Sequence, residues 1–159
     1  MDIKLELKEF DLSLSIESSL MEEIETSIKK HYPKEFGGVY IGQYSESGKC
    51  LKITSIILPK KFRNTKILFF RYPASINREI KKIFNETEGK SIYVGEWHSH
   101  PNGFPTPSST DISTMFKIAK SKKVNIKYPL LSIYSYDGAK FDYNFFLICN
   151  TNVIKYEKS

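Results

Sequence analysis

Two histidines and an aspartate lie close together in the segment GEWHSHPNGFPTPSSTD, residues 95–111. One residue separates His98 from His100, and ten residues separate His100 from Asp111. Because successive side chains of a strand point to opposite faces, a strand through both histidines would place the two imidazoles on one face. The following loop, with its three prolines, can then return Asp111 to that face near the start of a helix. Two imidazoles and one carboxylate without a fourth ligand are typical of a zinc site that keeps one position open for water, so the spacing predicts a catalytic metal site.

Hydrolysis at such a site also needs a carboxylate to move protons. Glu96 precedes His98 by two residues and so shares its strand face. It is the near candidate for the base, but it also fits a partner of a histidine or a polar residue at the rim. Glu35, in the segment HYPKEFGGVYIGQY, is the distant candidate, and spacing alone does not choose between the two. His31 is better explained as a surface residue near the end of a helix than as a fourth metal ligand.

Several neighbours of these residues also have purely structural interpretations. Ser108 and Asp111 match the Ser-x-x-Asp pattern of a helix start, which is compatible with a ligand in the first helical turn. Trp97 should face away from the histidines and belong to the core. Gly37 and Gly38 fit either a close approach of two backbones, with room for an extended substrate tail, or a simple bend.

Hydrophobic spacing and turn residues predict helices separated by pairs of strands. The predicted fold is mixed α/β or α+β in a single domain, 1–159. Helices are expected over 18–32, over 75–87 and around 112–119. Strands are expected over 3–16 (one or two), 39–44, 51–58, 67–72, 91–98, 130–136 and 141–149, with hairpins joining 39–44 to 51–58 and 130–136 to 141–149.

The composition limits the possible partners. The net charge is +6, but the lysines are spread along the chain without the dense basic stripe of a nucleic-acid binder, so no nucleic-acid partner is predicted. No apolar run is long enough for a bilayer, and the N-terminus lacks the apolar core of a secretory signal, so we expect no membrane partner and a cytoplasmic protein. Cys50 and Cys149 have no metal-like spacing, and no disulfide is expected.

The motif residues together resemble the signature of the JAMM, or MPN-plus, metalloproteases. That signature is His-x-His-Pro, a short loop, Pro-Ser, and an aspartate three residues after the serine. An upstream glutamate that precedes a small-residue strand completes it, and PKEFGGVYIG matches this context. The matching residues are His98, His100, Pro101, Pro107, Ser108, Asp111 and Glu35.

The resemblance implies a curved mixed β-sheet flanked by helices, with a cytidine-deaminase-like architecture. It also implies a role for each matching residue. His98, His100 and Asp111 would bind Zn2+. Glu35 would act as base and then as acid, and Ser108 would donate a hydrogen bond to the oxyanion of the tetrahedral intermediate.

In its length and in the motif segments GEWHSHP and PTPSSTD, the chain is most similar to the free-standing bacterial JAMM proteins. These are often encoded beside homologues of ubiquitin-activating and ubiquitin-conjugating enzymes, including in CBASS antiphage operons. The resemblance implies an isopeptidase or peptidase that removes a ubiquitin-like modifier or a protein joined through its C-terminal tail to a target lysine. The alternatives are an inactive MPN-type scaffold and a zinc hydrolase of another amide. A nucleoside deaminase would normally carry a Pro-Cys-x-x-Cys ligand pair, which is missing.

Overall fold

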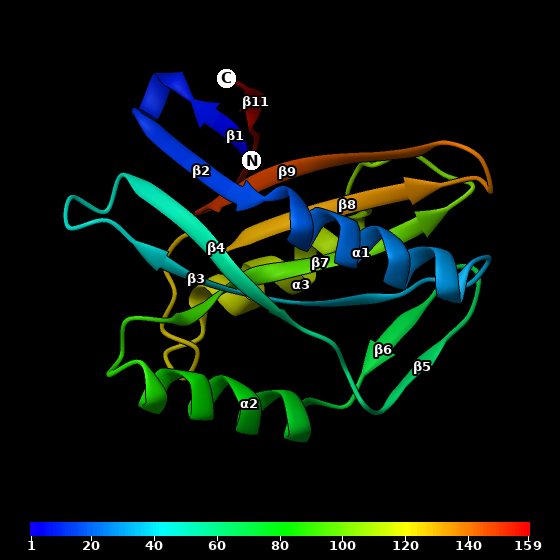
Figure 1. Cartoon of the computed structure of the whole chain (residues 1–159), viewed down its shortest axis with the longest axis horizontal. Helices are drawn as coiled ribbons and strands as arrows, with labels where there is room; N and C mark the ends of the chain where they lie inside the picture. The colour runs from blue at the N-terminus through cyan, green and yellow to red at the C-terminus, as the bar shows by residue number, and fades with distance from the viewer.

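A nine-stranded mixed sheet runs through the middle of the molecule, as a computed structural model of all residues 1–159 shows (Figure 1). The strand order is β10-β9-β8-β7-β3-β4-β2-β1-β11, and a separate hairpin pairs β5 with β6. The strands are β1 (Asp2–Leu7), β2 (Leu12–Glu17), β3 (Gly37–Tyr44), β4 (Cys50–Ile57), β5 (Phe62–Asn64), β6 (Phe69–Arg71), β7 (Ile92–Pro101), β8 (Leu130–Tyr136), β9 (Phe141–Cys149), β10 (Asn152–Lys155) and β11 (Glu157–Lys158).

Three α-helices cover the sheet: α1 (Ser18–His31), α2 (Pro73–Glu86) and α3 (Ser109–Lys120). A short 3-10 turn, Lys8–Phe10, lies between β1 and β2. In Figure 1, α1 crosses the front of the sheet and α3 lies behind it. None of the helices is both long and apolar enough to cross a bilayer.

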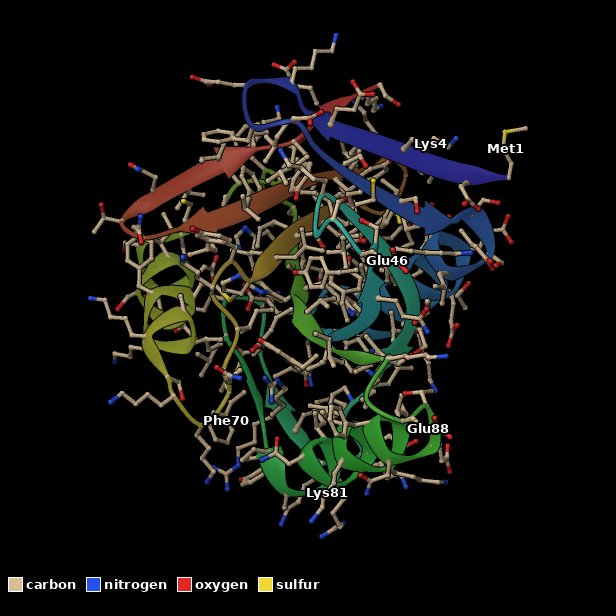
Figure 2. The ribbon with its side chains drawn as sticks, turned by 90° about the vertical axis from the view of Figure 1, so that its left-hand side faces the viewer. Met1, Lys4, Glu46, Phe70, Lys81 and Glu88 are labelled. Carbon is tan, nitrogen blue, oxygen red and sulfur yellow. The ribbon has the colours of Figure 1, made fainter.

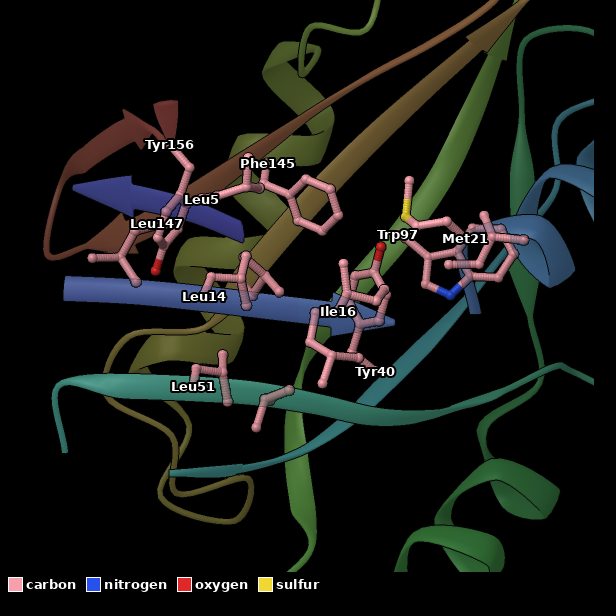
Figure 3. Packing of buried hydrophobic residues seen from close by; sticks show 14 of the residues in the cluster. Leu5, Leu14, Ile16, Met21, Tyr40, Leu51, Trp97, Phe145, Leu147 and Tyr156 are labelled. Atoms are coloured by element: carbon pink, nitrogen blue, oxygen red, sulfur yellow. The ribbon is translucent and has the colours of Figure 1, made fainter. Parts of the chain in front are cut away.

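The main core lies on the side of the sheet that α1 covers, and it gathers side chains from β1, β2, β4, β7, β8 and β9 as well as from α1 (Figure 3). The buried face of α1 carries Met21, Ile24 and Ile28, whose spacing of three and four residues forms one helical stripe. These residues pack with β2 and β7 side chains such as Ile16 and Trp97. The helix ends just before Pro33, which has no amide hydrogen with which to continue it.

Two smaller clusters fill the opposite face of the sheet. Met115 of α3 packs with Leu131 and Ile133 of β8, and Ile76 of α2 packs with Val39 and Ile41 of β3. β7 lies between β8 and β3, and its side chains on this face, Glu96, His98 and His100, stay partly exposed.

The predicted mixed fold and both predicted hairpins are confirmed. The short strands β10 and β11 near the C-terminus were not predicted, and the other main differences from prediction are the following. The predicted strand 67–72 shrinks to β6 and pairs with an unpredicted β5. The helix predicted from residue 75 begins at Pro73, where a missing amide hydrogen costs nothing. The strand predicted to end at His98 continues to Pro101.

Candidate metal centre

The central strand β7 brings His98 and His100 to one face. β7 pairs with antiparallel β3 on one side and with parallel β8 on the other. His98 lies opposite Ile133, which belongs to the cluster under α3, whereas Trp97 belongs to the core under α1. The histidines therefore face the α3 side of the sheet, and Trp97 points the other way, as the strand alternation predicted.

Gly37 and Gly38 allow β3 to approach β7 closely at this point. Gly37 is opposite His98, and a Cβ atom added to it would lie 2.4 Å from the Trp97 carbonyl oxygen and 2.7 Å from His98 Cβ. A Cβ atom on Gly38 would lie 2.7 Å from the Ile57 carbonyl oxygen and 2.9 Å from the Trp97 ring. Both glycines lie within β3, so of the two interpretations the structure supports close backbone approach and not a simple bend.

Asp111 reaches the histidines from the first turn of α3. Ser108 is the N-cap of this helix: its Oγ accepts the Asp111 amide hydrogen at 3.1 Å, and its own amide donates to Asp111 Oδ2 at 2.7 Å. This reciprocal capping box orients the carboxylate. As a result, Oδ1 lies 3.0 Å from His98 Nε2 and Oδ2 lies 3.2 Å from His100 Nε2.

The three side chains fit a zinc ion in chemistry and in spacing. Their ligand atoms all lie within 4.8 Å of one another, and the two Nε2 atoms are 3.2 Å apart. Zinc binds such atoms at about 2.0–2.2 Å with tetrahedral geometry, which separates neighbouring ligand atoms by roughly 3.3 Å. The structure thus brings His98, His100 and Asp111 together at ligand spacing, and their assignment to zinc remains a prediction.

Electrostatics keep the carboxylate of this cluster ionised. Burial alone would raise the pKa of Asp111, but hydrogen bonds from His100 and His98 outweigh it and hold the pKa well below its usual range. Burial alone would lower the pKa of His100, whereas the hydrogen bond and charge of Asp111 raise it. Asp111 therefore offers a negatively charged carboxylate to a metal ion.

A second contact orients His100. Its Nδ1 lies 3.3 Å from the carbonyl oxygen of Phe104, in the loop between β7 and α3. When Nδ1 donates its hydrogen to this carbonyl, the lone pair of Nε2 is left free for a metal. Asn144 in turn holds the loop, because its Nδ2 donates to the Pro105 carbonyl oxygen at 3.0 Å.

Glu35 lies on the other side of the cluster, in the loop between α1 and β3. The Glu35 amide donates to the Thr65 carbonyl oxygen at 2.8 Å, and the Glu35 carbonyl oxygen accepts a hydrogen bond from Asn64 Nδ2 at 2.9 Å. The β5–β6 hairpin therefore fixes its backbone, which spacing in the sequence did not indicate. Partial burial raises the pKa of Glu35, the charges of His98 and His100 lower it, and that of Asp111 raises it further, with a net rise.

The other two candidate residues have partners elsewhere. Glu96 accepts a hydrogen bond from Tyr93 Oη at 2.7 Å and pairs with Arg71 Nη2 at 2.8 Å, so its carboxylate ties β7 to β6. His31 stacks on Phe36 with ring centroids 3.8 Å apart and lies outside the ligand cluster. It is half-buried and not the surface residue that the sequence suggested.

A cleft of about 900 Å³ joins Glu35, Ser108 and the three candidate ligands. One wall is the β5–β6 hairpin and the other is the first half of α3. Ser108 uses its Oγ lone pair for the cap, and its hydroxyl hydrogen has no acceptor within the protein. It is therefore available to a bound substrate.

The fold is shared with known proteins. A protein of Desulfitobacterium hafniense, solved in solution, has the same fold, with a TM-score of 0.68 and 19% identity over 89% of this chain and 88% of that chain. The family model described as prokaryotic homologs of the JAB domain matches residues 17–149. The chain therefore belongs to the prokaryotic JAB-domain family, and the JAMM resemblance is confirmed.

Two curated relatives have similar sequences along most of this length. A protein of Escherichia coli named CD-NTase/cGAS isopeptidase is 32% identical over 111 residues, which are 68% of this chain and 69% of the relative. A protein of the same name from Enterobacter hormaechei is 30% identical over 129 residues, 80% of this chain and 69% of the relative.

Proposed function

We propose that the chain is a cytoplasmic, zinc-dependent isopeptidase or peptidase. It cleaves the bond after the C-terminus of a ubiquitin-like modifier or conjugated protein, and so reverses bacterial ubiquitin-like conjugation in antiphage defence. The observation that carries the proposal is the convergence of three candidate zinc ligands on one cleft with Glu35 on its opposite side. The names of the two curated relatives support the same reaction.

Each group in the cleft has a task in amide hydrolysis. His98, His100 and Asp111 would hold zinc, which supplies a Lewis acid that polarises the scissile carbonyl and lowers the pKa of water. Glu35 accepts the proton of the attacking water and delivers it to the departing lysine amine as the carbon–nitrogen bond breaks. The Ser108 hydroxyl donates a hydrogen bond to the oxyanion.

An extended substrate tail has a place to bind beside these groups. β6 pairs with β5 on one edge only, and its residues Phe69 to Arg71 line the cleft. Because the Thr65–Leu68 and Tyr72–Lys61 hydrogen bonds point toward β5, the backbone groups of Phe69 and Arg71 point toward the unpaired edge. A tail can therefore add to β6 as a further strand.

Two other functions fit the site less well. An inactive scaffold has no need of Glu35 and three ligand groups facing one cleft. A hydrolase of a small amide would use the same chemistry but would have no use for an unpaired strand edge along the cleft.

The test uses a modifier joined through its C-terminus to a target lysine, with and without a chelator. Glu35→Gln should keep its zinc and lose roughly 10²-fold to 10⁴-fold of the rate, because only the proton carrier is removed. Glu46→Gln, at an exposed turn far from the cleft, is the matched control and should behave as wild type. His98→Ala and Asp111→Ala should lose zinc itself, measured by elemental analysis of the purified protein. Full activity in Glu35→Gln would exclude Glu35 from the mechanism, and unchanged zinc in both alanine variants would reject the ligand assignment.

A further inference from the structure

The β5–β6 hairpin, taken as residues 60–71, is firmly anchored at its base. Phe62 and Phe69 pack on the buried Phe36, with ring centroids 5.2 Å and 5.7 Å from it. Arg71 pairs with Glu96 on β7 at 2.8 Å, where both side chains are mostly buried. The hairpin is therefore a fixed wall of the cleft, and its surface is presented in a defined place.

The tip of this wall and its strand β6 expose apolar side chains. Ile67 is 88% exposed, Leu68 57% and Phe70 51%, and all three line the cleft. Figure 2 labels Phe70 at the lower left, on the hairpin between α2 and α3. Large apolar side chains gathered at one place on the surface indicate a binding site.

The same wall carries more positive charge than this chain neutralises. Residues 47–78 contain eight lysines and arginines and no aspartate or glutamate, and all three arginines of the protein are among them. Five of the eight belong to the hairpin: Lys60, Lys61, Arg63, Lys66 and Arg71. Of these five, Arg71 alone has a carboxylate partner, and Lys66 lines the cleft without one.

The opposite wall offers no charge of either sign above the metal ligands. Its cleft-lining residues on α3, beyond Asp111, are Thr110, Thr114, Met115 and Ile118. The cleft's remaining carboxylates are Glu96, which is neutralised by Arg71, and Glu35, which the reaction uses. The hairpin thus determines the charge that a bound tail meets.

We propose that the hairpin selects a substrate tail with apolar side chains and at least one acidic residue close to the scissile bond. This rests on the proposed function and adds the chemistry of the tail. The acidic side chain meets Lys66, and the apolar side chains cover Ile67, Leu68 and Phe70. Such charge complementarity acts chiefly on binding and on selection among partners.

A protein tail suits this surface better than a nucleic acid. Two of the three exposed apolar residues are aliphatic, whereas bases stack on aromatic side chains or on guanidinium planes. The unpaired edge of β6 also offers backbone hydrogen bonds to an extended peptide.

Turnover is tested with the modifier–target substrate in three versions, which carry two glutamates, two glutamines or two lysines just before the scissile bond. Wild type should cleave the glutamate version best and the lysine version worst, with each step changing kcat/KM by roughly threefold to tenfold through KM. The differences should shrink as salt is raised. Lys66→Glu should reverse the order. Lys4→Glu makes the same charge change at an exposed site on β1, at the upper right of Figure 2, and should keep the wild-type order.

Binding is measured separately, with fluorescein-labelled ten-residue tail peptides and a labelled ten-nucleotide single-stranded RNA on Glu35→Gln. Equal turnover of the three versions by wild type would overturn the tail preference and leave the proposed function intact. If no version is cleaved but the glutamate peptide binds best and Lys66→Glu abolishes this, the tail preference stands and the proposed function fails. RNA that binds more tightly than the glutamate peptide, in a Lys66-dependent manner, would overturn the preference in favour of a nucleic acid.

Discussion

Ser108 contributes to the helix and to the cleft through different atoms. Its oxygen lone pair accepts the Asp111 amide hydrogen, and its hydroxyl hydrogen is left for a ligand in the cleft. The capping pattern that the sequence predicts and the catalytic role that the family resemblance implies are thus compatible. The two roles differ in what their loss should do, so they can be measured separately.

Ser108→Ala should lower both stability and rate. Loss of the cap should cost about 1 kcal/mol of unfolding free energy, and loss of an oxyanion donor should reduce kcat by roughly 10²-fold to 10³-fold. Denaturant unfolding and steady-state kinetics measure the two effects. Ser109→Ala, at the exposed neighbouring position, is the control and should change neither. A rate that falls only as far as the folded fraction does would restrict Ser108 to capping.

The protonation of Glu35 should depend on the metal. In the metal-free protein burial raises the pKa of Glu35, so its carboxyl should titrate above the range of an exposed glutamate. A bound cation favours the charged carboxylate, so zinc should lower this pKa. The carboxyl carbon shift, followed by NMR against pH with and without zinc, reports both values. If the pKa of Glu35 does not change on zinc binding, Glu35 lies too far from the metal to accept a proton from the attacking water.

At the scale of elements, a latch connects the loop that carries Glu35 to the loop that follows the histidines. Tyr32 Oη donates to Asn102 Oδ1 at 2.7 Å across 70 residues of sequence. Asn102 has a left-handed backbone, with φ of 58°, and its amide donates to the Tyr136 carbonyl oxygen. The Tyr32 and Tyr136 rings pack edge to face. These contacts hold the loop of Glu35 and the loop after the two candidate histidine ligands in one geometry.

Tyr32→Phe should disturb that geometry without removing a ligand. We expect zinc content and KM to stay near wild type while kcat falls by roughly twofold to tenfold, the effect of one hydrogen bond. Tyr128→Phe removes a hydroxyl from an exposed tyrosine outside the cleft and is the matched control. If kcat is unchanged, or if KM rises instead, the latch does not position the base.

The sequence predicted the elements better than their pairing. The three candidate ligands fall within residues 98–111, so local spacing was enough to predict them, and the same spacing predicted Ser108 as the start of a helix. Spacing left Glu35 and Glu96 as alternatives, and only the family resemblance favoured Glu35. The pairing of Gly37 with His98 is what brings Glu35 to the site, and no local pattern encodes that pairing. Glu96 shares the strand face of His98, but its carboxylate forms an ion pair with Arg71. The position of Arg71 depends on the β5–β6 hairpin. β5 was missed because the segment KKFRN is short and charged, and its role is to hold the backbone of Glu35.

For the molecule as a whole, the α1 side of the sheet supplies the largest share of the burial. Nineteen buried residues form this core, from β1 at one end to Tyr156 near the C-terminus. β11 pairs with β1, so the two ends of the chain lie side by side at one edge of the sheet (Figure 1). The candidate metal ligands lie on the other face, so we expect that the two regions can be altered separately.

Ile16→Ala tests that separation. Ile16 is fully buried in the core under α1, and its truncation should lower the unfolding free energy by about 2–5 kcal/mol. Zinc content of the folded protein should be unchanged, since β2 contributes nothing to the cleft. Ile67→Ala, at an 88% exposed position, should leave stability within about 0.5 kcal/mol of wild type. Denaturant titration with elemental analysis measures both, and a metal-deficient folded Ile16→Ala protein would show that the faces are coupled.

Asp111 takes part both in the capping box of α3 and in the cluster of candidate metal ligands. The oxygen that receives the Ser108 amide also faces His100, and the other faces His98. The capping of α3 and the binding of a metal ion would therefore use the same carboxylate. A bound ion would oppose fraying of the helix from its amino end, and unwinding of the first turn would remove one of the three candidate ligands.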